Sequence, residues 1–246
     1  MKQRLQKFLA SHGLGSRREI ERWIEEGRFR IDGNPATLGV KVDIDNRIEL
    51  DGKRLKLSQK VFKRRVIIYN KPEGEISTRR DTEGRKTVFD KLPVKNSERW
   101  IAVGRLDMNT SGLLLFTNDG DLANQLMHPS SNIDREYAVR VNGNVDEAMI
   151  KRLKEGVLLE DGQARFTDIQ PGRESTGKNS WFYVVLMEGR NREVRRLWES
   201  QNVRVSRLKR VRYGNVFIPS HLKAGKYDEL DDNAVAQLAQ LAGLEN

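Results

Sequence analysis

Residues 100–129 read WIAVGRLDMNTSGLLLFTNDGDLANQLMHP and contain two apolar runs separated by a polar connection. The runs Trp100–Val103 and Leu113–Phe116 predict two buried strands, and the residues after them predict a short helix that ends before Pro129. The connection presents one carboxylate, Asp107. A rigid scaffold that carries one polar side chain on a loop is a common way to build a reactive site. Taken alone, an aspartate after GRL is more often a turn residue that hydrogen-bonds its own backbone.

The composition limits the classes of protein to which this chain can belong. Its 246 residues are 37% hydrophobic and 33% charged, which suffices for one large domain or for a small domain beside a medium one. No apolar run approaches the ~18 residues that cross a bilayer. The first residues lack the pattern of a signal peptide, so we expect a cytoplasmic protein.

The chain contains no cysteine and only three histidines, His12, His128 and His221. The missing thiols exclude disulfides, a cysteine nucleophile and thiolate metal sites. The histidines are far apart in the sequence and show no spacing typical of metal ligands, so we expect no metal centre. No Gly-rich dinucleotide fingerprint or phosphate-binding loop indicates a cofactor.

The net charge of +10 favours a polyanionic partner. Half of this excess lies in residues 1–60, where 14 basic residues face 9 acidic ones. A second concentration runs from Glu188 to Arg212, with nine basic and three acidic residues. Two basic zones that are far apart in the sequence predict one surface for docking and another that lines a site.

Residues 4–33, RLQKFLASHGLGSRREIERWIEEGRFRIDG, have the pattern of a helix–helix–strand unit. Apolar residues at positions 5, 8 and 9 predict a first helix that ends at Gly13. Ser16, followed three residues later by Glu19, is a capping box that begins a second helix, and Gly27 closes it. The alternation at positions 28–31 predicts a strand that turns at the next two residues.

The start of this second helix carries two cations, Arg17 and Arg18, where the positive end of the helix dipole disfavours them. Free backbone N–H groups and guanidinium groups in one place make a strong phosphate site. Arg4, Lys7 and Arg28 are available on neighbouring elements. We therefore interpret this face as a phosphate-binding surface, in preference to an ordinary solvated helix start.

Residues 51–65 are polar and basic with little periodicity, which predicts a linker and a domain boundary near residue 60. The strand expected at 66–69 leads into a turn at Pro72, beside which we expect Lys71 to be exposed to solvent. Further strands are predicted at 135–141, 164–169 and 181–186, with a polar loop at 171–180 between the last two. Helices are predicted at 146–154 and 231–244.

The second basic zone contains a predicted helix whose apolar face is Val194, Leu197 and Trp198. Arg192 and Arg196 would share another face at i,i+4, where like charges repel unless an anion lies between them. They are therefore candidates for contacts with the polyanionic partner. A solvated stripe that pairs with the neighbouring glutamates explains the pattern equally well.

The GRLD connection and its flanking strands resemble the catalytic motif of pseudouridine synthases, in the branch that modifies ribosomal RNA. The resemblance covers nearly the whole chain. It implies that Asp107 is the catalytic carboxylate and that Tyr137, in the segment Arg135–Tyr137, stacks on the target uracil. It also implies that Arg195 pairs with the catalytic aspartate.

Three further residues are candidates for the substrate pocket. Leu208 matches a position in the pocket wall of the family. Arg105 and Thr110 lie beside Asp107 in the sequence and could orient its loop or an RNA phosphate.

Residues 4–33 resemble an S4-type RNA-binding module along their whole length. The positions that match the RNA face of that family are Arg4, Lys7, Ser16, Arg17, Arg18 and Arg28. The two resemblances imply an α+β fold. Residues 1–60 would form an S4-like helical RNA-binding domain, and residues 61–246 a catalytic domain on a mixed, mainly antiparallel sheet with helices against it.

The implied reaction breaks the bond between uracil N1 and ribose C1′, turns the freed base and joins its C5 to C1′. This isomerisation needs no cofactor. A buried carboxylate must stay ionised to take part, and a neighbouring guanidinium offsets the cost of burial. Asp107 would either attack C1′ or remove a ribose proton, and the sequence does not choose between the two.

We expect a monomer that modifies a folded element of large-subunit (23S) ribosomal RNA, with small-subunit ribosomal RNA as the alternative target. A non-catalytic RNA-binding protein would explain the charge and the S4-like module, but it would not need the GRLD turn or a large second domain. An RNA methyltransferase would require a Gly-rich loop or a knotted pocket for its methyl donor. The chain shows no signal for the first of these.

Overall fold

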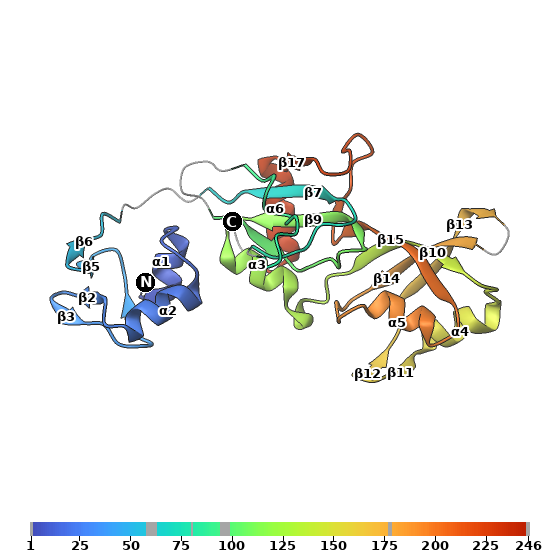
Figure 1. Ribbon diagram of the computed structural model, residues 1–246, viewed down its shortest axis with the longest axis horizontal. Coiled ribbons are helices and arrows are strands. Elements are labelled where there is room, and N and C mark those ends of the chain that lie inside the picture. Colours follow the sequence, from blue (N-terminus) through green and yellow to red (C-terminus); the bar gives the residue numbers. More distant parts are fainter. Residues whose placement is uncertain (1, 58–62, 80, 94–98, 177–178, 245–246) are drawn as a thin grey trace. The chain divides into compact units, whose positions relative to one another are not determined.

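The computed structural model in Figure 1 describes residues 2–57, 63–79, 81–93, 99–176 and 179–244. The chain forms two compact units. Residues up to Lys63 belong to the first unit, and Arg64–Pro93 together with the chain from Trp100 onward belong to the second. The predicted domain boundary near residue 60 lies outside the described residues. The α+β class is confirmed.

The first unit is a small module around one core in which Leu5, Leu9, Ile20 and Phe29 are fully buried. Its helices are α1 (Leu5–Ser11) and α2 (Arg17–Glu25). Its strands are β1 (Gln3–Arg4), β2 (Phe29–Ile31), β3 (Asn34–Pro35), β4 (Lys41–Val42), β5 (Ile48–Leu50) and β6 (Lys53–Arg54). β1 pairs with β4, and the others form an antiparallel sheet in the order β3-β2-β5-β6.

Helix α2 begins where the capping box predicts. The Glu19 amide donates to Ser16 Oγ at 3.1 Å, and the Ser16 amide donates to the Glu19 carboxylate at 3.3 Å. Gly27, just past the helix end, has a φ of 70°, which only glycine adopts without strain. The local signals in this segment are therefore sufficient to place the helix.

The second unit is built on a large sheet with the strand order β13-β14-β10-β15-β9-β7-β17, on which β16 pairs with β15 and β8 with β9. Its strands are β7 (Val66–Lys71), β8 (Ile101–Val103), β9 (Ser111–Thr117), β10 (Arg135–Asn142), β13 (Asp168–Thr176), β14 (Asn179–Leu186), β15 (Arg204–Tyr213), β16 (Val216–Phe217) and β17 (Tyr227–Glu229). Among the described strands of this sheet, only β9 and β15 run parallel. A separate hairpin joins β11 (Val157–Leu159) to β12 (Gly162–Ala164).

Alternate residues of β7 and β9 point into two different cores. Ile67 and Tyr69 belong to the core that also contains residues of α4 (Glu147–Glu155) and α5 (Glu193–Glu199). Val66 and Ile68 belong to the core that contains residues of α3 (Gly120–Met127) and α6 (Asp232–Leu241). A short 3-10 turn, η1 (Pro129–Ser131), follows α3. Buried on both faces, β7 and β9 form the rigid centre of the unit.

Two sequence predictions about the secondary structure around β13, β14 and α5 are wrong. The polar loop expected at 171–180 is mostly strand, because β13 continues to Thr176 and β14 starts at Asn179. An antiparallel hairpin can keep one face in water, so its polar residues did not argue against strands. Arg192 does not share a helical face with Arg196, because it precedes α5 with a φ of 49°.

Candidate active site

The connection that carries Asp107 joins β8 to β9. Because β9 runs antiparallel to both β7 and β8, this connection lies beside the end of β7. Lys71, the last residue of β7, lies opposite Gly112 near the start of β9. A Cβ at Gly112 would collide with the backbone of Arg210 on β15, so only glycine allows β15 to approach here. Three strands thus meet at the base of the turn that runs from 104 to 110.

Lys71 is fully buried, contrary to the prediction that solvent surrounds it. Its ammonium group donates to the carbonyl oxygens of Asp107 at 2.9 Å, Thr110 at 2.8 Å and Pro72 at 3.1 Å. Burial lowers the pKa of Lys71 to about 8, and the charge of Asp107 opposes this shift. The prediction failed because turn carbonyls that lie inside the fold need donors, and local sequence does not reveal which carbonyls are enclosed.

The other carbonyls of the turn are also held by groups from outside it. Ser77 Oγ donates to Leu106 at 2.8 Å, the Gly74 amide to Met108 at 2.8 Å, and Arg195 Nη2 to Asn109 at 2.8 Å. Every carbonyl from 106 to 110 therefore accepts a hydrogen bond from a distant element or from Lys71. The backbone that presents the Asp107 carboxylate is fixed before any substrate arrives.

Arg195, on α5, is only 5% exposed and links three elements. Its Nη1 donates to Val205 on β15 at 3.0 Å, while Nη2 reaches the turn. No ion pair joins Arg195 to Asp107, although both lie in the described chain, so the direct pair implied by the resemblance is absent here. Burial lowers the pKa of Arg195, and the charge of Asp107 acts in the opposite direction. The Arg195 guanidinium therefore holds the turn through a backbone carbonyl. It acts on the Asp107 carboxylate only by charge–charge attraction.

A cavity of about 870 Å³ opens in front of the turn. Asp107 and Tyr137 both line it, although Tyr137 comes from β10. The predicted pocket residues Arg105, Thr110 and Leu208 also line it. Asp107 is half-buried and Tyr137 is buried, so the carboxylate is less enclosed than the sequence suggested. The structure thus brings together residues that are up to a hundred positions apart.

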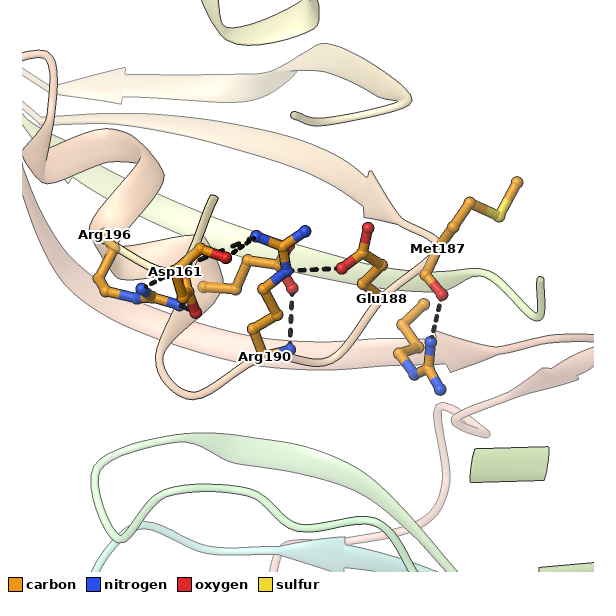
Figure 2. A network of polar contacts seen from close by, with 7 residues as sticks. Asp161, Met187, Glu188, Arg190 and Arg196 are labelled. Atoms are coloured by element: carbon orange, nitrogen blue, oxygen red, sulfur yellow. Dashed lines mark hydrogen bonds and ion pairs between the residues drawn. The ribbon is translucent and has the colours of Figure 1, made fainter. Parts of the chain in front are cut away.

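The rim of the cavity includes the segment Met187–Arg192, part of which is shown in Figure 2. Arg190 pairs with Glu188 at 2.6 Å. Arg196 donates from both terminal nitrogens to Asp161, each at 2.8 Å, and these hydrogen bonds lower the pKa of Asp161. Of the three basic candidates on this segment and α5, Arg192 lines the cavity, whereas Arg195 and Arg196 do not.

Two buried arginines that line the cavity were not singled out from the sequence. Arg135 donates to Met187 O at 2.7 Å and to the Tyr213 hydroxyl at 3.0 Å. Arg210, which is directly opposite Tyr137 on β15, donates to Leu113 O at 2.7 Å. The available signal for Arg135 was its phase, because it falls on the same face of its strand as Tyr137, Val139 and Val141.

The predicted RNA-binding residues of the first unit differ in exposure. Arg4, Arg17 and Arg18 are exposed, whereas Lys7 and Ser16 are half-buried. Arg28 makes two hydrogen bonds to Asp51, at 2.9 and 2.6 Å, and lies 5.0 Å from the centre of the Trp23 ring.

The lowered pKa of Lys71 predicts that the free energy of unfolding depends on pH. Its pKa of about 8 in the folded chain lies below its ordinary value of 10.5, so between these values the unfolded chain binds more protons. The contribution of Lys71 to the free energy of unfolding therefore rises with pH through this window, by at most about 1.4 kcal/mol per pH unit, and is lost as the pH falls through 8. Urea unfolding at pH 8 and pH 10 should show this rise in the wild type and not in Lys71→Met. The same rise in both proteins would contradict the assignment.

Two further properties of the described residues bear on the site. They contain no group of three His, Asp or Glu side chains placed to hold a metal ion. In the same residues, every helix is too short or too polar to cross a bilayer.

Comparisons with known proteins place this chain among its relatives. The profile of a family described as RNA pseudouridylate synthase matches residues 65–200, and that of the S4 domain matches residues 3–48. A ribosomal large subunit pseudouridine synthase B of Pseudomonas aeruginosa is 57% identical over 244 residues. These cover 99% of this chain and 63% of the relative, so the chain spans less than two thirds of that protein. A protein of the same name from Pasteurella multocida is 57% identical over 98% of this chain and 71% of its own length.

Among solved structures, the crystal structure of a pseudouridylate synthase superposes with a TM-score of 0.65. It is 22% identical and covers 96% of this chain and 99% of its own, which supports the fold alone. The family profile covers more than half of the chain. The matched residues include the Asp107 turn, and they also include Tyr137 and Arg195. The chain therefore belongs to the RNA pseudouridylate synthase family.

Proposed function

We propose that this chain converts a uridine of large-subunit (23S) ribosomal RNA to pseudouridine. The observation that carries the proposal is the Asp107 turn, whose carbonyls at positions 106–110 are held in place while Asp107 lines a cavity with Tyr137. The relatives named ribosomal large subunit pseudouridine synthase B support the choice of large-subunit RNA. Small-subunit RNA is the alternative target.

The reaction uses the chain's own groups. The target uridine leaves its stack, at a cost of a few kcal/mol, and enters the cavity against Tyr137. Asp107 attacks C1′ as the N1–C1′ bond breaks and is displaced when C5 of the turned base bonds to C1′, or it removes a ribose proton as that bond breaks and returns the proton when C5 rejoins. N1 takes up a proton in exchange for the one that C5 then loses. Loss of the C5 proton restores the aromatic base. Lys71 and Arg195 hold the turn, so the carboxylate does not have to be reorganised during the reaction.

The first unit supplies a second contact with the RNA. Its exposed Arg17 and Arg18 at the start of α2 would bind phosphates together with Arg4. With ribosomal RNA as the substrate, we place the protein in the cytoplasm and expect it to act as a monomer.

Incubation of ribosomal RNA with the protein and no added small molecule tests the reaction class. Pseudouridine should form, since the isomerisation needs no donor. A methyltransferase would leave the RNA unchanged until its donor was added, and a binding protein would leave it unchanged in both cases. Mapping pseudouridines in both ribosomal RNAs, from cells with and without the protein, identifies the target subunit.

Arg195→Lys should reduce turnover severely. An ammonium group lacks the planar fork that reaches Val205 and Asn109 together, so the turn would lose one of its supports. We expect kcat to fall on the order of tenfold to a hundredfold with little change in RNA affinity. Single-turnover rates at saturating RNA measure this. Wild-type rates in the variant would show that Arg195 does not position the turn.

A further inference from the structure

One face of the strands β13, β14, β10 and β15 carries no helix from the described residues of the second unit. α4 and α5 lie on the other face (Figure 1), where Tyr137, Val139 and Val141 of β10 are buried. The residues between them, at positions 136, 138 and 140, are partly exposed. The uncovered face is therefore opposite the one that contributes Tyr137 to the cavity.

The strand register shows which side chains share this face, because directly opposed residues point to the same side of a sheet. One row across three strands is Trp181, Arg140 and Arg207, and the next is Tyr183, Ala138 and Lys209. Arg204 lies on the same face, opposite Asn142. We name six of these residues the sheet patch: Arg140, Trp181, Tyr183, Arg204, Arg207 and Lys209.

The sheet patch carries four cations that form no ion pair within the described part of the chain. Within the described residues, no ion pair involves Arg140, Arg204, Arg207 or Lys209, and Arg140 Nε donates instead to Ser206 Oγ at 2.9 Å. Among the described side chains, the carboxylates of Glu136 and Asp168 on this face already have partners, which are Arg212 for Glu136 at 2.7 Å and Lys154 for Asp168 at 3.2 Å. Four like charges on one surface repel each other unless a polyanion binds.

The two aromatic rings of the patch indicate which class of polyanion it binds. Trp181 and Tyr183 are two positions apart on β14, which spaces them by about 6.8 Å on one face. Tyr183 is 44% exposed and Trp181 is half-buried, and the neighbour of Tyr183 across the strand is the small Ala138. Exposed rings beside cations stack with bases while the cations contact the backbone, a combination found on surfaces that bind single-stranded nucleic acid.

We propose that the sheet patch binds a single-stranded stretch of RNA. The bases stack on Trp181 and Tyr183, and the phosphates lie along Arg207 and Lys209 on β15. This surface is separate from the catalytic cavity, so it goes beyond the proposed function and adds a third RNA contact to those of the cavity and the first unit. A long ribosomal RNA can occupy the cavity and the patch at the same time.

The charge contribution is tested with Arg207→Ser/Lys209→Ser in the full chain. The probe is a fluorescent ten-residue oligouridylate, titrated at several salt concentrations. The variant should bind about tenfold more weakly, and the slope of its salt dependence should fall by ~0.7 for each phosphate that the protein no longer neutralises. The matched control, Lys151→Ser/Arg165→Ser, removes two exposed charges outside the patch, from α4 and the segment after β12, and should change affinity less than about twofold. Equal weakening in both variants, or none in the first, overturns the proposal.

The stacking contribution is tested with Trp181→Leu/Tyr183→Leu, which keeps all four charges. Affinity for the oligouridylate should fall about tenfold or more, and thermal melting checks that the variant is folded. Unchanged affinity in a folded variant would indicate a general polyanion surface and would overturn the single-strand proposal. Photocrosslinking with a 4-thiouridine oligonucleotide gives an independent readout that does not need substitutions. Crosslinks to the peptide of Trp181 and Tyr183 support the proposal, and crosslinks confined to the first unit and the cavity contradict it.

Discussion

Asp107→Asn is expected to abolish pseudouridine formation while RNA affinity stays close to that of the wild type. An amide can neither attack C1′ nor accept a ribose proton, so turnover should fall on the order of 10³-fold or more. The hydrogen bonds that fix the turn use the backbone carbonyl of Asp107 and not its carboxylate. The substitution therefore leaves the scaffold in place. Single-turnover assays on ribosomal RNA, together with binding measurements, separate the two effects.

Glu73→Gln provides a matched control for this prediction. Glu73 is an exposed carboxylate whose charge reaches both Lys71 and Arg195, as that of Asp107 does. Its loss changes the local charge by the same amount without removing the reacting group. We expect near-normal turnover in Glu73→Gln. Normal turnover in Asp107→Asn would mean that the reacting carboxylate has been misassigned.

Lys71→Met should reduce kcat on the order of 10²-fold with little effect on RNA binding. The methionine fills similar space but donates no hydrogen bond, so the carbonyls of Pro72 and Thr110 lose the ammonium that holds them. A shift of the Asp107 carboxylate by even 1 Å is sufficient for an effect of this size. The melting temperature should also fall. Steady-state kinetics should show the loss in kcat rather than in KM.

Lys91→Met is the control for the loss of a lysine in the same unit. Lys91 is exposed and lies 3.8 Å from Glu75, so its removal disturbs no turn carbonyl. Its kcat should match that of the wild type. If Lys71→Met also retained the wild-type kcat, the turn would not depend on the buried ammonium.

Much of the fold could be read from local sequence. The capping box at Ser16 and Glu19 places α2, because its hydrogen bonds form within one turn of helix. The alternation of Tyr137, Val139 and Val141 gives the buried face of β10. The strands at 164–169 and 181–186 were predicted, but the extension of β13 to Thr176 and of β14 back to Asn179 was missed, because this pairing depends on contacts between strands and not on the apolar content of either end.

The candidate active site likewise combines residues that local sequence predicts with residues whose position depends on tertiary contacts. Asp107, Tyr137 and Arg195 were selected by their motifs, and the structure places the first two on one cavity and the third behind the turn. Lys71 was judged from its local setting as an exposed turn residue. Burial reversed that prediction, since a charge that satisfies several enclosed carbonyls is more stable inside the fold than its polarity suggests.

The sequence by itself determined the periodicities, the helix ends, the excess of positive charge and the motif residues, because each of these depends on neighbours a few positions away. Tertiary structure alone decided which groups meet. Lys71 from β7, Arg195 from α5 and Ser77 converge on a turn between β8 and β9, and none of these approaches is encoded in local spacing. The physical reason is that buried backbone groups must find partners wherever the packing of the strands provides them.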